Sequence, residues 1–297
     1  MKITLRQLLY FDALARERHF GRAANRVAVT QPAMSAQIRD LEALIGAPLV
    51  DRAPGGLSLT PLGREVERRA QLVLREAAEI EGLGSTSETP IRLGMIPTLA
   101  PYLVPEFLAK AAAQGAVVSV SEGLTARLLD QVRAGDLDAA VVALPSSDAA
   151  LIERFLFEER FLLAVPESDS TGRPVAPSRP EEIDPSRLLL LDEGHCLADQ
   201  TLAACNMRRD TGRPSLGATS LTTVSRLVAS GQGITLIPEI AASVEGTGLR
   251  LQRFLDPEPG RRIGLVMRRG GENAKWVEQI ETLLVQAQRS ISHTSIT

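Results

Sequence analysis

The sequence predicts an α/β protein in two parts: a small helical N-terminal part that ends in a hairpin and a long helix, and a larger two-lobed α/β part. Apolar residues recur at helical spacing between Leu5 and Leu44, which predicts the helical part. From Ile91 onward, short apolar strands alternate with helical stretches, which predicts the larger part. Residues 84–90 separate the two, because they are mostly small and polar, as in a flexible linker.

Two helices open the chain. Residues 5–18 form the first predicted helix, and residues 20–27 form the second, whose small residues allow close packing. The stripe of the first helix that we expect to face the core comprises Leu8, Leu9, Phe11, Leu14 and Ala15.

The third predicted helix begins after Thr30 and runs to about Leu44. Thr30 is a suitable N-cap, and Pro32 occupies an early helical position where its missing N–H costs nothing. Gly46 follows the end of the helix. The inner stripe comprises Met34, Ile38 and Leu41.

A hairpin and a long helix complete the first part. Residues 49–59 contain a Pro-Gly-Gly turn between short apolar stretches, which predicts the hairpin. Thr60 and Pro61 then predict the start of a helix that continues to about Leu83. Apolar residues at steps of three, four or their sum predict a seam that pairs with another helix. This seam comprises Leu62, Val66, Val73, Ile80 and Leu83.

In the second part, the alternation of strands and helices predicts a parallel sheet with flanking helices. The predicted strands are residues 91–96, 116–121 and 137–144, and the predicted helices are residues 101–113 and 124–134. Residues 160–165 are expected to cross into a second lobe, and residues 263–267 to cross back. The second lobe would contain residues 188–191, 221–229 and 233–238, and a closing helix would span residues 276–288 before a frayed end. Two crossings predict a cleft between two lobes.

Composition is typical of a soluble globular protein, because 44% of the 297 residues are hydrophobic and 23% are charged. No apolar run approaches the roughly 18 residues of a membrane span, and the N-terminus lacks the features of a signal peptide. We therefore expect a cytoplasmic protein with no membrane partner.

The net charge of −3 hides an asymmetry along the chain. Residues 1–60 carry eight Lys and Arg against five Asp and Glu, which is +3 and leaves −6 for the remainder. A basic domain on an acidic protein favours phosphate binding by that domain, although ordinary surface charge would produce the same count.

Residues 20–52, FGRAANRVAVTQPAMSAQIRDLEALIGAPLVDR, resemble the signature of the LysR-type transcriptional regulators. The matching positions are Ala23, Ala24, Thr30, Gln31, Pro32, Ser35, Ile38, Leu41, Glu42, Gly46, Leu49 and Arg52, with small departures at Ile45 and Asp51. The resemblance implies a winged helix-turn-helix over residues 1–60 and a dimerisation helix with a hinge over residues 61–89. It implies a two-lobed regulatory domain of the periplasmic-binding-protein type over residues 90–297.

The same resemblance implies that the third helix places its first turn and outer face on DNA. The implied DNA-binding residues are Arg6, Thr30, Gln31, Pro32, Ala33, Ser35, Gln37, Arg39 and Arg52. Arg39 has an alternative role, an ion pair with Asp40 or Glu42. The family also implies double-stranded DNA with an imperfect palindrome, a homodimer or homotetramer, and RNA polymerase as partners.

The two cysteines, Cys196 and Cys205, are too few for a disulfide-stapled secreted domain. They are either buried filler or redox groups. The segment DEGHCLADQTLAAC at 192–205 resembles the OxyR-like, hydrogen peroxide-sensing branch of the LysR family, as do residues 96–105, 218–238 and 261–268. This resemblance implies that Cys196 reacts with peroxide and then forms a disulfide with Cys205.

The chemistry requires a thiolate and donors to the leaving oxygen. Residues 197–204 have the composition of a helix, so Cys196 is predicted near a helix N-terminus, whose dipole favours the thiolate. The resemblance assigns the donors to Thr98, Thr125 and His195, the nearby positive charge to Arg261, and a role in local geometry to Asp199.

The spacing of the cysteines predicts a switch. Nine steps along a straight helix would separate their α-carbons by roughly 13 Å, whereas a disulfide tolerates only about 4.4–6.8 Å. The segment between Cys196 and Cys205 would therefore have to refold before the bond could form.

Two other functions fit the same sequence. A LysR-type regulator could bind a small organic effector in the cleft, using Thr98 and a turn at Gly231 and Gly233, with incidental cysteines. A thiol peroxidase with a DNA-binding domain would need a fast reductant. A peroxide-sensing regulator would need only slow resetting by a glutaredoxin or thioredoxin system. We expect no enzyme activity, metal or cofactor. A hydride- or phosphate-handling enzyme is not supported, since the chain has neither a P-loop nor a dinucleotide fingerprint.

Overall fold

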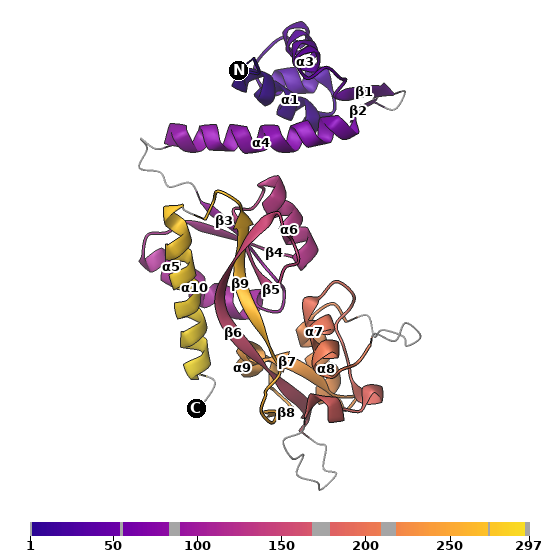
Figure 1. Cartoon of the computed structure of the whole chain (residues 1–297), viewed down its shortest axis with the longest axis vertical. Helices are drawn as coiled ribbons and strands as arrows, with labels where there is room; N and C mark the ends of the chain where they lie inside the picture. Colours follow the sequence, from indigo (N-terminus) through magenta and orange to yellow (C-terminus); the bar gives the residue numbers. More distant parts are fainter. Residues whose placement is uncertain are drawn as a thin grey trace. The chain divides into compact units, whose positions relative to one another are not determined.

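The computed structural model describes residues 2–53, 56–82, 90–167, 179–208, 218–272 and 274–294. The chain forms two compact units, Met1–Thr89 and Pro90–Thr297, called here the N-terminal and the C-terminal unit (Figure 1). The predicted linker falls largely on residues 83–89, outside the described residues. Within the described ranges, no helix has both the length and the apolar character to cross a membrane.

The N-terminal unit is a small helical domain with a hairpin and a long helix (Figure 1). Its elements are α1 (Leu5–Glu17), α2 (Phe20–Arg26), α3 (Gln31–Ile45), β1 (Val50–Ala53), β2 (Gly56–Leu59) and α4 (Pro61–Gly82). The strands β1 and β2 pair antiparallel, as the predicted hairpin requires. Phe11, Leu14, Met34, Ile38 and Leu41 are fully buried and form the core between the first three helices.

The inner face of α1 differs from its predicted stripe. Leu9 is 46% exposed, and Gln7 is buried instead. Gln7 turns inward because it forms a capping box with Thr4, in which each side chain bonds to the backbone N–H of the other residue. The buried set therefore begins at position 7 and continues at 11, 13, 14 and 15, and Leu9 falls outside it.

The start of α4 is fixed against the end of the hairpin. The Thr60 hydroxyl accepts from the backbone N–H of Gly63 at 2.9 Å, as predicted for an N-cap, and donates to the carbonyl of Pro48 at 3.0 Å. A Cβ atom at Gly63 would lie 2.0 Å from the Leu49 carbonyl oxygen, so only glycine permits this approach. Further along, Gln71 of α4 donates to Asp12 of α1.

The C-terminal unit is a mixed sheet with helices on its faces (Figure 1). Its first lobe contains β3 (Ile91–Met95), α5 (Ala100–Ala113), β4 (Val118–Glu122), α6 (Thr125–Ala134) and β5 (Ala139–Leu144). Its second lobe contains α7 (Cys196–Ala204), α8 (Leu221–Ala229), β7 (Thr235–Pro238), α9 (Ala242–Glu245) and β8 (Leu249–Gln252). The strands β6 (Leu151–Pro166) and β9 (Gly260–Arg268) join the lobes, and α10 (Lys275–Thr294) closes the unit. The predicted α/β fold class is confirmed.

The sheet is parallel only in its first lobe. Its strand order is β4-β3-β5-β9-β6-β7, with β8 beside β6. The strand β3 pairs parallel with β4 and β5, whereas β9 runs antiparallel to both β5 and β6. The buried residues of both lobes form one continuous core across this sheet.

Three features of this unit differ from the sequence prediction. The crossing strand β6 begins at Leu151, whereas the sequence predicted a start at Arg160. Its first half was missed because short apolar groups there are interrupted by charged residues. Residues 188–191 form only an isolated bridge, between Leu188 and Ile234. The helix α10 continues to Thr294, beyond the point where a frayed end was expected.

Candidate functional site

The cysteine segment is a short helix with a cysteine at each end. Cys196 is the first residue of α7, His195 is its N-cap and Cys205 is its C-cap. The position of Cys196 at a helix N-terminus agrees with the sequence prediction. Gly194 has a φ of 92°, and a Cβ there would lie 3.1 Å from the side chain of Leu124, so the glycine suits this tight turn.

A small, closed pocket surrounds Cys196, and as it stands it leaves no room for a water-sized molecule. The first lobe contributes the segment after β3 and the start of α6, and the second lobe contributes the turn into α7. The lining residues are Ile96, Pro97, Thr98, Leu124, Thr125, Gly194, His195 and Cys196. The fold therefore brings together four residues of the predicted peroxide site, Cys196, Thr98, Thr125 and His195, although Thr98 and Cys196 lie far apart in the sequence.

Two polar atoms of this pocket have no internal partner. The Thr125 hydroxyl oxygen and the His195 Nδ1 atom are buried without a hydrogen bond to any described residue. Burial lowers the pKa of His195, against the opposing charges of Asp192 and Glu122. The imidazole is therefore neutral at neutral pH, and together with the threonine it offers hydrogen-bonding capacity to a small polar molecule.

Arg261 reaches the pocket indirectly, through Thr98. Its Nη1 donates to the Thr98 hydroxyl at 2.7 Å and its Nη2 donates to the Thr98 carbonyl at 3.2 Å. The opposite edge of the guanidinium donates through Nε to Glu159 at 2.6 Å. The predicted positive charge thus acts on the site from behind Thr98, and Arg261 is not among the residues that line the pocket.

Glu159 is a functional candidate that the sequence analysis missed. It lies on β6 in direct register with Arg261 on β9, and burial raises the pKa of its carboxyl against the opposing effect of Arg261. Its sequence neighbours Glu158 and Arg160 are also charged, so the sequence does not distinguish it from them, whereas in the structure Glu159 is buried between these two exposed residues. A charged residue in such a position needs a partner.

Asp199 lies apart from these residues. It is exposed on the first turn of α7 and does not line the pocket. Its expected role in local geometry stays a prediction.

The two cysteines are free thiols in different environments. Cys196 is half-buried, whereas Cys205 is buried and burial raises the pKa of its thiol to about 11. Since α7 is intact between them, its rise separates the two ends by roughly 13 Å, which agrees with the predicted need for refolding.

A larger cavity of about 1130 Å³ lies beside the crossing strands. Arg261 and Glu159 are among its lining residues, whereas Thr98, Gly231 and Gly233 are not. The residues suggested for a small organic effector therefore do not line this cavity.

The N-terminal unit presents the predicted DNA-binding surface on α3. The Thr30 hydroxyl accepts from the backbone N–H of Ala33 at 3.4 Å, which confirms the predicted N-cap. Of the remaining predicted residues, Gln31, Pro32, Ala33 and Arg39 are exposed on α3, Ser35 and Gln37 are half-buried there, and Arg6 is exposed on α1. Arg52 lies on β1, and its side chain is outside the described residues.

Arg39 has neither of the ion pairs, with Asp40 or with Glu42, that were its alternative role. Its Nε donates to the carbonyl of Ser35 at 3.3 Å. The Glu42 carboxylate instead accepts from the backbone N–H groups of Leu49 and Val50, where it holds the start of the hairpin. The hydrogen bond to Ser35, on the same helix, therefore orients the exposed guanidinium of Arg39.

Comparison with known families accounts for both units. Residues 5–64 match the bacterial regulatory helix-turn-helix protein model of the lysR family, and residues 84–289 match the LysR substrate binding domain. The chain belongs to the LysR family of transcriptional regulators. As a LysR-family protein it is a DNA-binding regulator, and its helical N-terminal unit is the helix-turn-helix domain.

Individual relatives place this LysR-family chain more narrowly. It is 39% identical to a probable hydrogen peroxide-inducible genes activator of Mycobacterium avium, covering 89% of this chain and 88% of the relative. It is 36% identical to the DNA-binding transcriptional dual regulator OxyR of Escherichia coli K12, covering 94% and 93%. The chain therefore belongs to the OxyR-like branch.

Solved structures agree with this branch. A full-length OxyR variant from Pseudomonas aeruginosa matches with a TM-score of 0.73 and 31% identity, over 96% of this chain and 97% of the other. A hydrogen peroxide-bound OxyR mutant from Corynebacterium glutamicum matches with a TM-score of 0.64 and 33% identity, over 99% and 96%.

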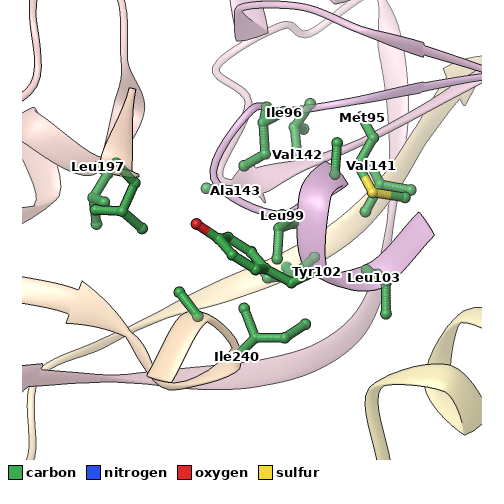
Figure 2. Packing of buried hydrophobic residues seen from close by; sticks show 14 of the residues in the cluster. Met95, Ile96, Leu99, Tyr102, Leu103, Val141, Val142, Ala143, Leu197 and Ile240 are labelled. Carbon is green, nitrogen blue, oxygen red and sulfur yellow. The ribbon is translucent and has the colours of Figure 1, made fainter. Parts of the chain in front are cut away.

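Two hydrogen bonds to one carboxylate join elements of the first and second lobes within the interior of the C-terminal unit. Figure 2 shows the neighbouring interior, where Tyr102 of α5 directs its hydroxyl toward the side on which Leu197 of α7 lies. The Tyr102 hydroxyl donates to Glu245 at 2.9 Å, and Thr222 donates to the same carboxylate oxygen at 2.7 Å. These bonds connect α5 of the first lobe to α8 and α9 of the second, beside the helix that carries Cys196.

Proposed function

We propose that this LysR-family regulator senses hydrogen peroxide through Cys196 and transmits the signal through a disulfide with Cys205. The observation that carries the proposal is the small pocket, in which a half-buried thiol at a helix N-terminus faces Thr98, Thr125 and His195. The OxyR relatives named as peroxide-inducible activators, and the OxyR mutant that binds hydrogen peroxide, support the choice of ligand.

The first step is an attack by sulfur on oxygen. The Cys196 thiolate attacks the nearer peroxide oxygen, and the O–O bond breaks as the S–O bond forms. The farther oxygen leaves as hydroxide and takes up a proton to become water. Sulfur is thereby oxidised to a sulfenic acid while the peroxide is reduced. Thr98, Thr125 and His195 would donate to the leaving oxygen, and Arg261 would stabilise the developing charge.

The second step consumes Cys205. Its thiolate attacks the Cys196 sulfur, an S–S bond forms, and the sulfenic hydroxyl leaves as water after protonation. The buried Cys205 is poorly suited to this attack while α7 is folded, because its thiol pKa is about 11. Unwinding of α7 would both expose Cys205 and bring the two sulfurs within bonding distance. Reduction by a glutaredoxin or thioredoxin system would restore the thiols.

The refolded segment would then alter how paired subunits present their helix-turn-helix domains. We propose that the chain acts as a homodimer or homotetramer that binds the halves of an imperfect palindrome in double-stranded DNA through α3, with RNA polymerase as its downstream partner. The exposed residues Gln31 and Arg39, at the start and on the outer face of α3, support this surface.

The decisive experiment is a non-reducing peptide map of the reduced protein after one equivalent of hydrogen peroxide. We expect a Cys196–Cys205 crosslinked peptide in the wild type. Cys196→Ser should form no crosslink and should keep its remaining thiol after peroxide treatment. Its affinity for nonspecific duplex DNA should be unchanged. Cys205→Ser should stop at the sulfenic acid, trapped by dimedone. Thiol loss in Cys196→Ser equal to that of the wild type would exclude Cys196 as the sensor.

The same measurement separates the alternatives. Effector pockets usually enclose about 300–1,000 Å³, whereas the closed Cys196 pocket has no room for even a water-sized molecule. A regulator that binds an organic effector would keep both thiols after peroxide treatment. A thiol peroxidase would consume many equivalents of peroxide with a thioredoxin-like donor, whereas a sensor would turn over slowly.

A further inference from the structure

We propose that Glu159 is a positioning residue for the peroxide reaction, and that it acts through Arg261 to direct the hydroxyl proton of Thr98 into the Cys196 pocket. The inference rests on the proposed function and adds a residue to it. Three bonds carry it: Glu159 to Arg261 Nε at 2.6 Å, and Arg261 to the Thr98 hydroxyl and carbonyl at 2.7 and 3.2 Å.

The hydrogen-bonding capacity of the Thr98 hydroxyl determines where its proton can be donated. A threonine hydroxyl has one proton to donate and two lone pairs that accept. Because Arg261 has only N–H donors, the Thr98 oxygen must accept from it. The Thr98 proton is then left for another acceptor, and Thr98 lines the pocket that contains Cys196. Thr98 would therefore act toward peroxide as a donor.

A donor is what the leaving oxygen needs. When the Cys196 thiolate forms its bond to one peroxide oxygen, the other oxygen departs with the electron pair of the O–O bond. Hydrogen bonds to that oxygen stabilise the transition state more than the intact peroxide, so a pre-oriented donor accelerates the step.

Glu159 holds the guanidinium in the orientation that this arrangement requires. The Arg261 and Glu159 side chains are 0% and 4% exposed, so each depends mainly on the other for its ionic partner. The two residues face each other across β6 and β9, which fixes their backbones. The Phe161 ring, 6.0 Å from the guanidinium carbon, packs on the same group. Loss of the Glu159 charge would leave Arg261 buried without its counter-ion and free to tilt away from Thr98.

The test uses the full-length reduced protein with Cys205→Ser, so that only the first step is followed. Two rates are measured for Cys196: sulfenic acid formation with hydrogen peroxide, trapped by dimedone, and alkylation by iodoacetamide. Alkylation needs the thiolate but no donor to a peroxide oxygen. We expect Glu159→Gln to slow the peroxide reaction about tenfold, the loss typical of a misdirected buried hydrogen bond. Alkylation should change less than about twofold, because it does not use that bond.

The matched control is Glu158→Gln, the same change at the adjacent and exposed residue of β6. It should leave both rates unaltered. A double-mutant cycle supplies the decisive readout: Thr98→Val alone should slow the peroxide reaction, and adding Glu159→Gln should slow it no further. If Glu159→Gln fails to fold, Glu159→Asp retains the charge and should give an intermediate peroxide rate.

Three results would overturn the inference: an unchanged peroxide rate, an equal loss in the alkylation rate, or additive losses in the double variant. An unreactive Cys196 in the parent protein would instead overturn the proposed function, and the inference with it.

Discussion

At the scale of single residues, folding shifts the protonation equilibrium of His195. Burial lowers its pKa, so the folded protein binds this proton less tightly than the unfolded chain. The stabilisation from the neutral imidazole is therefore present above the unfolded pKa of about 6.5. It is lost as the pH falls below that value, because the unfolded state then gains the proton.

We expect the C-terminal unit to lose stability as the pH falls below about 6.5, and His195→Gln to weaken this dependence. Trp276, the only tryptophan, lies on α10, so its fluorescence during urea unfolding reports this unit without a signal from the other. His19→Gln is the control, since His19 is exposed at the N-cap of α2 in the N-terminal unit. The same pH dependence in His195→Gln as in the wild type would contradict the prediction.

At the scale of elements, the stability of α7 opposes the disulfide. Ala203 is exposed on this helix, so glycine there removes no packing and lowers helix propensity by up to about 1 kcal/mol. We expect Ala203→Gly to speed disulfide closure from the sulfenic acid by up to about fivefold. Formation of the sulfenic acid itself should keep its rate.

Quenched-flow sampling followed by non-reducing peptide mapping measures the two steps separately. Ala109→Gly provides the same substitution at an exposed position of α5 and should leave closure unchanged. Equal closure rates in Ala203→Gly and the wild type would mean that unwinding of α7 does not limit the second step.

Elements with local signals were predictable from the sequence, and elements defined by distant partners were not. The Thr30 cap, the Gly46 end and the start of α7 are each encoded within a few residues. The first nine residues of β6 were missed because four of them are charged and only pairing with β9 makes this stretch a strand. Glu159 was missed for the same reason, since its partner Arg261 lies 102 positions away.

The same difference between local signals and distant partners applies to the site. The resemblance supplied Cys196, Thr98, Thr125 and His195, and the structure adds the pocket that unites them. The route from Arg261 to the pocket by way of Thr98 could not be predicted, because a side chain's direction depends on packing from strands and turns remote in sequence.

At the scale of the whole molecule, α4 carries an apolar stripe that its own unit does not cover. Leu62, Val73 and Ile80 are 40%, 45% and 68% exposed. These are members of the predicted seam, and Val66, another member, packs against the core of the N-terminal unit instead. An exposed row of this kind at helical spacing favours pairing with a second helix.

We expect Val73→Asp to weaken self-association, because it places a charge in the middle of that stripe. Sedimentation velocity over a concentration series should show the lighter species increasing, and affinity for palindromic DNA should fall with it. Glu76→Gln, an exposed polar change on the same helix, is the control. An unaltered oligomer in Val73→Asp would show that α4 is not the subunit contact.

The crossing strands limit how the C-terminal unit can respond to its signal. β6 and β9 remain hydrogen-bonded from Leu151 to Arg160, with a single irregularity between Phe155 and Phe157. Rotation of one lobe against the other would twist these paired strands and break some of the hydrogen bonds between them. A rearrangement confined to a segment beside β6 and β9 would cost less free energy, because it would keep these hydrogen bonds. We therefore expect a response of the C-terminal unit to change segments beside β6 and β9 and to keep the pairing of these two strands.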